Sequence, residues 1–337
     1  MKKIFLFGLF LIMTLEISAQ ELSAGINNHT LFLGGSIGLL NGVSEEIVYR
    51  DRNTKNKLSQ LLWDLKPLVY VGIDINYAWR KPENTWGVFA DTSFKVGIPG
   101  ETGVMEDRDW MNSRYPEFLT HYSVHENKTK NALFFDLSAG ISFQIFNRFL
   151  LKTYLAYDFM HFSWSAGGGS LLYPDSDGGH GYLRPITVIT YQQTWNIVSP
   201  GIAFYGEFNR YFNAEVAFKI SPLIWTRDKD NHVLRDLVIT DTLDIGLFVE
   251  PSLLFSFTPR DFFILSFSAS YRNISHIRGD GVYRFNNTNS EVHAKNMLGA
   301  GYSAFDLGLT AKFKLRRPVV SVEVDLPPQD GRDALFF

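Results

Sequence analysis

The stretch TLDIGLFVEPSLLFSF, residues 242–257, alternates apolar and polar side chains along most of its length. Successive side chains of an extended chain point to opposite sides, so this alternation predicts a β-strand with one apolar and one polar face. The apolar face would carry Leu243, Ile245, Leu247, Val249, Leu253, Phe255 and Phe257. The polar face would carry Asp244, Gly246, Glu250, Ser252 and Ser256. Such a strand separates an apolar surrounding from a polar one.

The same alternation recurs along the chain at residues 69–79, 133–145, 212–220 and 305–315. A soluble sandwich turns its apolar faces inward, whereas a membrane barrel turns them towards lipid, so alternation alone fits both folds. Long strands favour the barrel, because strands of globular proteins usually have about five or six residues. We therefore predict an all-β fold: a ten-stranded antiparallel transmembrane β-barrel that extends beyond the outer membrane.

The connections between the predicted strands alternate in length. Tight turns are expected at residues 146–148, 209–211 and 258–261. Longer polar loops are expected at residues 50–57, 106–130, 174–184, 228–240 and 284–295. Bacterial outer-membrane barrels have short periplasmic turns and longer extracellular loops. The long loops would therefore surround a water-filled mouth on the extracellular side of the cell outer membrane.

The two ends of the chain differ from this pattern. Residues 1–19 resemble a secretory signal peptide, with Lys2 and Lys3 before an apolar run and Ala19 at a small-residue cleavage site. We expect the barrel to occupy residues 20–315. The remaining tail, residues 316–337, contains two consecutive prolines and should lie on the periplasmic side.

The composition excludes several classes of protein. With no cysteine, the chain has no disulfide framework, thiolate metal site or thiol nucleophile. A net charge of -3 argues against nucleic-acid binding, which usually requires a basic patch. Aromatic residues make up 15% of the chain, which suits the aromatic girdles of a barrel at two lipid interfaces.

Two polar clusters could carry chemistry. Asp107 and Asp109 lie in MEDRDWM, residues 105–111, and the second cluster, RDKDNHV at 227–233, contains Asp228, Asp230 and His232. Residues two apart in an extended chain point to the same side. A carboxylate beside an imidazole fixes its tautomer and stabilises its charged form, as a general base acting on water requires. By spacing alone, either cluster could equally be a solvated loop.

Three further features are weaker indications of a functional site. His121 and His125 have a spacing that binds metal on a helix, but no helix is expected there, so we predict no metal site. Ser123 precedes His125 by two residues, a poor predicted geometry for a nucleophile and its base. The triple glycine at 167–169 lacks the strand-to-helix context of a phosphate loop, and we expect it to relieve crowding in a bent strand.

Taken together, these stretches resemble the omptin family, outer-membrane aspartyl endopeptidases built on a ten-stranded barrel. The resemblance extends from about Gly34 to Leu315, and its most specific part is the order of Asp-x-Asp-Trp-Met and Asp-x-Asp-x-His. It is carried by GVSEEIVY (42–49), LSQLLWDLKP (58–67), MEDRDWMN (105–112), THYSVHENKT (120–129), SAGGGSLLY (165–173), RDKDNHV (227–233) and YRFNNTNSEVHAKNMLGAG (283–301).

The resemblance implies a role for each matching residue. Asp230 and His232 would be the catalytic dyad, and Asp107 and Asp109 would be the acidic pair that faces it. Ser123 and His125 would bind substrate in the groove. Glu46 and Asp228 would form the pocket for a basic side chain. The dyad would take a proton from water, and the facing pair would position that water. Neither a cofactor nor an acyl-enzyme would be needed.

Some positions depart from the family pattern. His121 stands where the family often has an acidic residue, which leaves a preference for a second basic residue open. His161 and Thr194 stand in place of arginines that contact lipid A, which leaves a dependence on lipopolysaccharide open. Gly167 stands in place of another arginine.

Three functions remain to be weighed. The first is a monomeric outer-membrane endopeptidase that cuts cationic peptides or proteins after Arg or Lys, in contact with outer-membrane lipid and not with nucleic acid. The alternative is a non-catalytic barrel that acts as an adhesin or a small pore. A metal-dependent hydrolase at the rim is the third. The acid–histidine set favours the endopeptidase, because adhesion has no need of it.

Overall fold

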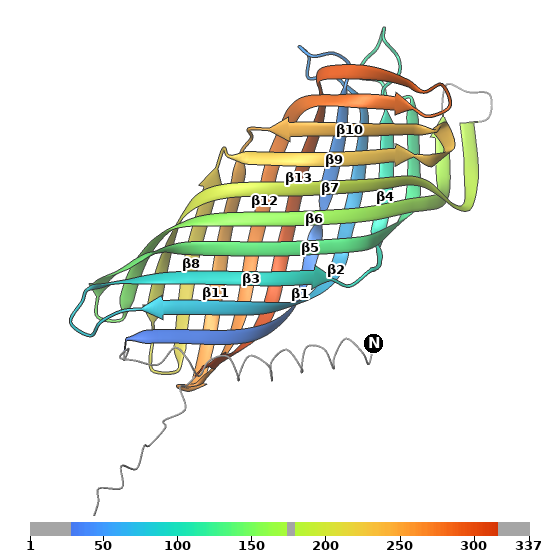
Figure 1. The fold of residues 1–337 in the computed structure, drawn as a ribbon. Helices are drawn as coiled ribbons and strands as arrows, with labels where there is room; N and C mark the ends of the chain where they lie inside the picture. Colours follow the sequence, from blue (N-terminus) through green and yellow to red (C-terminus); the bar gives the residue numbers. More distant parts are fainter. Residues whose placement is uncertain (1–27, 174–178, 316–337) are drawn as a thin grey trace, which may run out of the picture. The chain divides into compact units, whose positions relative to one another are not determined.

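The barrel is formed by the residues that the computed structural model describes, 28–173 and 179–315 (Figure 1). The expected signal peptide at 1–19 and the expected tail at 316–337 lie outside the described residues. Within the described ranges, no helix is long and apolar enough to cross a membrane.

Thirteen antiparallel strands make up the sheet within residues 28–173 and 179–315. They are β1 (His29–Tyr49), β2 (Lys57–Trp79), β3 (Trp86–Gly97), β4 (Gly100–Asp109), β5 (His121–Phe146), β6 (Phe149–Tyr173), β7 (Gly179–Glu207), β8 (Phe212–Ser221), β9 (Ile224–His232), β10 (Leu237–Asp244), β11 (Phe248–Arg260), β12 (Phe263–Phe285) and β13 (Ser290–Lys314), with one 3₁₀ turn, η2 (Val233–Arg235), between β9 and β10.

These strands close into a ring of about ten, as the sequence predicts. Three pairs of strands run end to end along shared neighbours: β3 and β4 between β2 and β5, β8 and β9 beside β7, and β10 and β11 beside β12. The first strand pairs with the last from Phe32↔Lys314 to Val48↔Leu298. Within the described residues, each strand pairs with a neighbour on both sides over at least part of its length, which closes the sheet into a barrel.

The alternation predicted one continuous strand over residues 242–257, and this is wrong. The stretch is divided between β10 and β11. The ladder is interrupted between Asp244 and Phe248, where Ile245 has a positive φ of 59°. This irregularity shifts the alternation by one position. As a result Leu243 faces the interior and is fully buried, whereas Leu253 faces outward and is 44% exposed.

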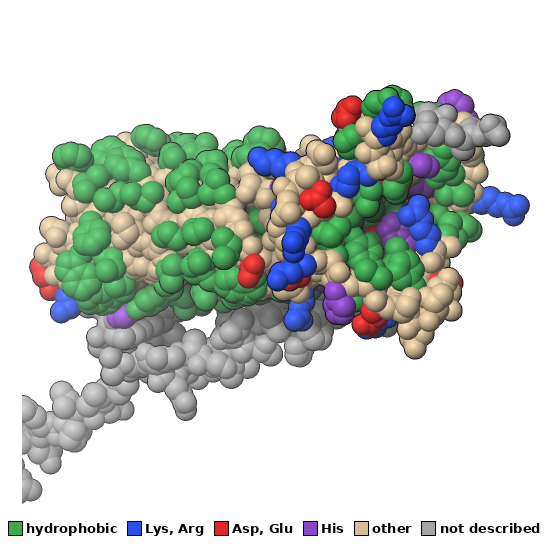
Figure 2. Space-filling model, turned by 90° about the horizontal axis from the view of Figure 1, so that it is seen from above, with side chains coloured by type: hydrophobic (Ala, Val, Ile, Leu, Met, Phe, Trp, Pro, Cys, Tyr) green, Lys and Arg blue, Asp and Glu red, His purple; other side chains and the backbone are tan. Residues whose placement is uncertain are grey.

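The outer wall of the barrel carries an apolar belt. Figure 2 shows hydrophobic side chains covering one part of the barrel surface, while charged side chains gather towards the other end. The exposed belt residues include Ile37, Leu39, Val71, Ile73, Phe94, Leu137, Ile141, Leu155, Ile202, Phe218, Phe255, Phe267, Leu307 and Leu309. An apolar exterior of this kind is the lipid-facing surface of an outer-membrane barrel.

Inside the belt, paired charges fill the lumen. Lys219 Nζ lies 2.6 Å from Asp158 Oδ1 and 3.1 Å from Glu250 Oε1. Arg272 lies 2.5 Å from Glu250 and 3.2 Å from Asp136. These contacts confirm that Glu250 faces the lumen, as expected from the polar face of its strand, and they link several walls of the barrel across its interior.

Breaking this lumen network should destabilise the barrel. We expect Lys219→Met to lower the free energy of unfolding by about 3–5 kcal/mol, because Asp158 would lose its nearest cation and Glu250 would lose one of its two cations while both remain buried. Chemical unfolding in lipid vesicles would measure the loss. Lys229→Met, on an exposed side chain of the same barrel, is the control. Equal unfolding midpoints for the two variants would contradict a stabilising role of the network.

The strands continue well beyond the belt, so several long loops predicted from the sequence are wrong in extent. β4 ends at Asp109 and β5 begins at His121, which confines the predicted loop 106–130 to residues 110–120. The predicted loop 228–240 is mostly strand, with a short turn at 233–236. Polar residues can remain in strands here because their backbones keep pairing with β2, β5, β7 and β12.

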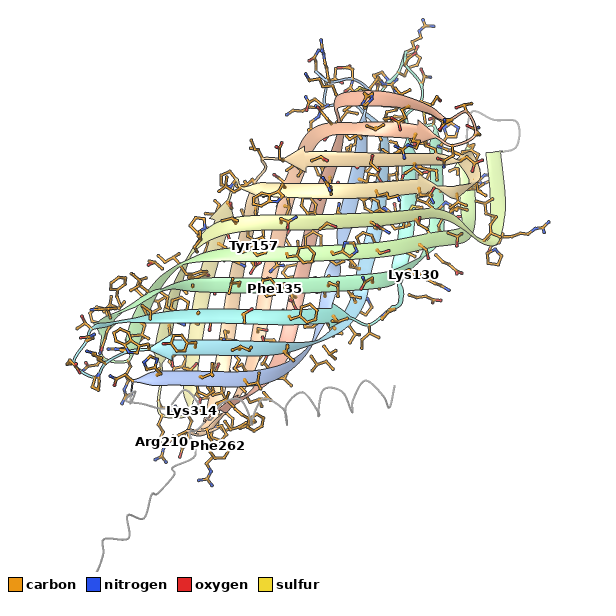
Figure 3. All side chains as sticks on the ribbon, viewed as in Figure 1. Lys130, Phe135, Tyr157, Arg210, Phe262 and Lys314 are labelled. Atoms are coloured by element: carbon orange, nitrogen blue, oxygen red, sulfur yellow. The ribbon has the colours of Figure 1, made fainter. Side chains whose placement is uncertain are left out.

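The other predicted connections agree better with the structure. The loop predicted at 50–57 separates β1 from β2, and the loop predicted at 284–295 shortens to residues 286–289. β7 already begins at Gly179, within the loop predicted at 174–184, whose residues 174–178 lie outside the described ranges. The tight turns gather at the opposite end, where Figure 3 shows Arg210 and Phe262 close to the end of β13. The barrel therefore has one short-turn end and one extended end.

Candidate active site

Two strands in the extended end carry the predicted catalytic residues on their inner faces. Strand β4 places Asp107 and Asp109 two positions apart, and β9 does the same with Asp228, Asp230 and His232. On β9 these three inner side chains are buried and the residues between them are more exposed, as alternation requires. All five side chains therefore point into the mouth of the barrel.

Asp230 and His232 form the predicted pair. Asp230 Oδ2 lies 2.6 Å from His232 Nε2, and the two side chains are 1% and 11% exposed. Burial lowers the pKa of His232, but the charge of Asp230 and its hydrogen bond outweigh burial, so the pKa lies above its ordinary value of 6.5. The imidazole is therefore oriented by a carboxylate and prepared to accept a proton.

Asp107 and Asp109 form the opposing acidic pair. The pKa of Asp107 is raised to about 7, mainly by burial and also by the negative charge of Asp109. The positive charge of His232 acts in the opposite direction. Asp107 Oδ1 is buried and has no hydrogen-bond partner. Because Asp107 and His232 influence each other's pKa, the acidic pair and the Asp230–His232 pair share one site.

Glu46 and Asp228 are buried below this level. Asp228 Oδ2 accepts hydrogen bonds from Tyr191 Oη at 2.8 Å and Gln193 Nε2 at 3.4 Å, and its Oδ1 accepts one from Thr226 at 3.1 Å. Burial raises the pKa of Asp228 to about 7, although these hydrogen bonds act in the opposite direction. Glu46 is 1% exposed, and its Oε2 has no hydrogen-bond partner. Burial and neighbouring acids hold the pKa of Glu46 well above its ordinary value.

Residues that the sequence did not single out form the floor of this pocket. Gln193 on β7 accepts hydrogen bonds from Trp195 Nε1 at 2.7 Å and from Ser44 on β1, so it connects two walls of the barrel. Next to it, Trp63, Trp164 and Tyr191 stack with ring centroids 5.4–5.8 Å apart. The available signal was the alternation in YQQTW, residues 191–195, which puts Tyr191, Gln193 and Trp195 on one face.

Ser123 and His125 are closer to each other than the sequence predicted. His125 Nε2 lies 2.8 Å from Ser123 Oγ, because residues two apart in β5 project from the same face. The expectation of poor geometry between them is therefore wrong. The other ring nitrogen, Nδ1, is hydrogen-bonded to the carbonyl oxygen of Gly168. Burial lowers the pKa of His125, which favours the neutral ring.

The triple glycine is a bend in β6, as predicted. Gly168 and Gly169 have φ values of 59° and 103°, and the register with β7 shifts around them. A Cβ on Gly169 would lie 1.9 Å from the carbonyl oxygen of Val124, so only glycine fits this position. The bend brings the carbonyl of Gly168 to His125.

His121 contacts Tyr173 and Thr120 and not a group of metal-binding side chains. Its ring packs against Tyr173 with centroids 4.7 Å apart, and its Nδ1 is 2.9 Å from Thr120 Oγ1. In the described part of the chain, no group of three or more His, Asp or Glu side chains is arranged to hold a metal ion. The metal-dependent hydrolase therefore receives no support from geometry.

Asp241 joins the site although no motif pointed to it. It lies on β10, directly opposite Asp228 in the β9–β10 ladder, and is 3% exposed. Neither of its carboxylate oxygens has a hydrogen-bond partner. Burial, followed by the charges of Asp228 and Asp230, raises the pKa of Asp241 well above its ordinary value. Had the β9–β10 hairpin been recognised, its register would have placed Asp241 beside Asp228.

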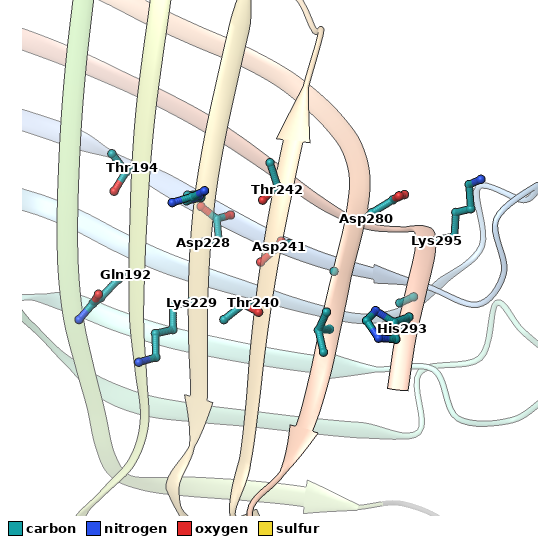
Figure 4. A pocket seen from close by; sticks show the side chains of 14 residues that line it. Gln192, Thr194, Asp228, Lys229, Thr240, Asp241, Thr242, Asp280, His293 and Lys295 are labelled. Atoms are coloured by element: carbon teal, nitrogen blue, oxygen red, sulfur yellow. The ribbon is translucent and has the colours of Figure 1, made fainter. Parts of the chain in front are cut away.

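A hollow of about 780 Å³ lies on the other side of the same wall, outside the mouth (Figure 4). Exposed side chains on alternate positions, such as Lys229, Thr240 and Thr242, border this hollow. Asp228 and Asp241 also border it, but their side chains are buried on the inner face of the strands. The hollow is therefore separated from the catalytic residues by the barrel wall.

The site should respond to pH through His232. We expect kcat/KM for peptide hydrolysis to rise with pH, with a midpoint above 6.5, because the raised pKa keeps the imidazole protonated, and unable to accept a proton, to higher pH. Asp107→Asn should move this midpoint to lower pH, since the charge of Asp107 raises the pKa of His232. Asp244→Asn, an exposed aspartate, is the control for pH–rate profiles. A midpoint that moves to higher pH in Asp107→Asn would contradict this assignment.

Most of the chain is similar in sequence to known proteins. A model of the omptin family matches residues 27–315. The chain is 27% identical over 315 residues to the outer membrane protease IcsP of Shigella flexneri, covering 88% of this chain and 96% of that protein. It is 26% identical over 228 residues to the plasminogen activator of Yersinia pestis, covering 66% and 70% of the two chains.

A solved structure shows the same barrel fold. The outer membrane protease OmpT from Escherichia coli superposes with a TM-score of 0.78, covering 87% of this chain and 99% of that chain. The two sequences are 20% identical over this alignment. At this level of identity the likeness establishes the fold, and the chemistry depends on the residues described above.

Proposed function

The chain belongs to the omptin family of outer-membrane proteases, and from this we propose that it is an endopeptidase that cuts peptides and proteins after arginine or lysine. The observation that carries the proposal is the buried Asp230–His232 pair, 2.6 Å apart, within electrostatic reach of Asp107. An adhesin or a pore has no need of an oriented histidine that shares a site with a second acidic pair.

The reaction would use water as the nucleophile. His232 accepts a proton from the water while the water oxygen bonds to the scissile carbonyl carbon, and Asp230 stabilises the resulting imidazolium. The C–N bond then breaks, and the leaving nitrogen receives a proton. Asp107, with a pKa of about 7, is protonated often enough near neutral pH to supply it. No covalent intermediate with the enzyme forms.

The buried acids below the dyad would hold the side chain before the scissile bond. Glu46 and Asp228 are almost fully buried, and burial of both without a cation is unfavourable. A guanidinium or ammonium group from the substrate would supply that cation and make charge-assisted hydrogen bonds. The pocket therefore supports a preference for a basic residue.

The site would face the extracellular side. The catalytic residues lie in the strand extensions at the end of the barrel away from the tight turns, and tight turns are periplasmic in bacterial barrels. At the positions expected for lipid A-binding arginines, His161 Nδ1 lies 2.8 Å from Thr194 Oγ1. Because this pair lacks a fixed positive charge, the proposal includes no lipopolysaccharide cofactor.

A peptide-library digest read by mass spectrometry tests the proposal. The full chain is folded in detergent and assayed with and without lipopolysaccharide, beside the Asp230→Ala/His232→Ala double variant. We expect cuts after Arg and Lys that vanish in the double variant and persist with a chelator or a serine-directed reagent. Full activity in the double variant would rule out the dyad. Binding of peptides without any cleavage would instead favour an adhesin.

A further inference from the structure

Asp241 is a buried carboxylate without a partner beside the proposed substrate pocket. The β9–β10 ladder pairs it directly with Asp228, and both side chains point inward. The two residues are equally buried, at 3% exposure each. They differ in their hydrogen bonds: Asp228 accepts from Tyr191, Gln193 and Thr226, whereas neither Oδ1 nor Oδ2 of Asp241 has a donor.

Such an arrangement is costly unless something fills the pocket. Buried carboxylates in proteins are nearly always hydrogen-bonded or paired with a cation. Among the pocket acids Glu46, Asp228 and Asp241, three oxygens lack a donor, namely both oxygens of Asp241 and Oε2 of Glu46, and Asp230 Oδ1 nearby lacks one as well. The charge of Asp241 raises the pKa of Glu46, so the two groups are within electrostatic reach of each other. A ligand that brings several N–H groups to one point would supply the missing donors.

A guanidinium meets this requirement better than an ammonium. Arginine presents five N–H donors in a rigid planar fork that pairs with carboxylates two at a time, whereas lysine presents three donors on one nitrogen. An arginine between Asp241 and Glu46 can satisfy all three free oxygens and still reach Asp228. A lysine in the same place presents its three N–H groups from a single nitrogen, so it cannot pair with a carboxylate two at a time and has no donor left for Asp228.

We propose that Asp241 is a third carboxylate of the substrate pocket and makes the pocket select arginine over lysine. This inference rests on the proposed function, because it assigns the residue that the endopeptidase prefers before the scissile bond. Asp241 does not contact the reacting atoms in this scheme. It determines specificity through the side chain that enters the pocket.

The test compares two peptides that differ only in Arg or Lys before the scissile bond. kcat/KM is measured for the unaltered chain, for Asp241→Asn and for Asp244→Asn, the exposed control on the same strand. We expect the unaltered chain and the control to favour Arg by about tenfold to a hundredfold. In Asp241→Asn the ratio should fall to within a few-fold of one, mainly through slower cleavage of the Arg peptide.

Heat-dependent migration on gels shows whether each variant is folded. We expect Asp241→Asn to be at least as stable as the unaltered chain, because it removes a buried charge and keeps the side-chain shape. An unchanged Arg/Lys ratio in the folded variant would overturn the inference and leave the proposed function intact. If the unaltered chain cuts neither peptide, the proposed function itself fails and this inference with it.

Proton release on substrate binding is a second measurement of the role of Asp241. A purely structural role of this residue would leave it unchanged. Burial, with help from neighbouring acids, raises the pKa values of Glu46 and Asp241 well above normal, so both groups keep their protons to higher pH than ordinary carboxyl groups do. The groups that face this cluster are Asp107 on β4, Tyr191 on β7, Asp228 and Asp230 on β9, and Tyr283 on β12. Calorimetry in buffers of different ionisation enthalpy should show protons released when an uncleavable Arg peptide binds, and fewer from Asp241→Asn. Equal release from both would overturn the inference.

Discussion

The His232→Ala variant is expected to lose about 10²–10⁴-fold in kcat for hydrolysis of an arginine-containing peptide, the usual contribution of a positioned general base. The reason is geometric: His232 Nε2 is held 2.6 Å from Asp230 Oδ2, and no other histidine in the described residues is paired with Asp230. KM should change much less than kcat, because the pocket acids that bind the substrate remain. Steady-state kinetics in detergent would measure both constants.

His293→Ala is the matched control, since His293 is exposed and borders the hollow on the outer face of the wall. It should retain the kcat of the unaltered chain. A His232→Ala variant that keeps more than about a tenth of kcat would be inconsistent with general-base catalysis by this residue. A change confined to KM would instead assign His232 to binding.

The second large effect concerns the substrate. We expect a peptide with Glu in place of the Arg before the scissile bond to be cut about 10³-fold more slowly. Its carboxylate would enter a pocket that already holds Glu46 and Asp228, and placing like charges together costs several kcal/mol, about one factor of ten per 1.4 kcal/mol. Competition between the two peptides in one reaction would measure the ratio of kcat/KM directly.

A norleucine peptide separates charge from size in this experiment, because norleucine fills the pocket without carrying a charge. It should be cut at a rate between those of the Arg and Glu peptides. In Asp228→Asn the gap between Arg and Glu should narrow by at least tenfold, since one of the repelling charges is gone. Equal rates for all three peptides would show that the pocket lies elsewhere.

The barrel, and the shared faces of the acidic and histidine side chains, could be predicted from the sequence for one physical reason. Alternation with period two decides both which face meets lipid and which side chains meet in the mouth. It therefore placed Asp107 with Asp109, and Asp230 with His232, correctly on common faces. The same rule also puts Ser123 and His125 on one face, so their separation of two residues, from which we predicted a poor geometry, brings them into contact.

What the sequence could not provide was the extent of the strands and the contacts between distant ones. Polar runs such as 228–240 are typical of loops, but here the ladder to β7 and β12 keeps them extended. The hydrogen bond from Ser44 to Gln193 joins residues far apart in the chain, and no local pattern marks it. Asp241 was missed for the same reason, because its partner across the hairpin depends on where the turn lies.

The bond between Ser44 and Gln193 has a consequence for how the protein matures. It links β1, which pairs with the last strand, β13, to β7, which contributes Gln193 to the floor of the pocket. Glu46 lies in the seam between β1 and β13, opposite Ala300. A chain still in transit would thus be harmless to the proteins around it, and proteolysis would begin with the final step of assembly, so that activity itself reports a finished barrel.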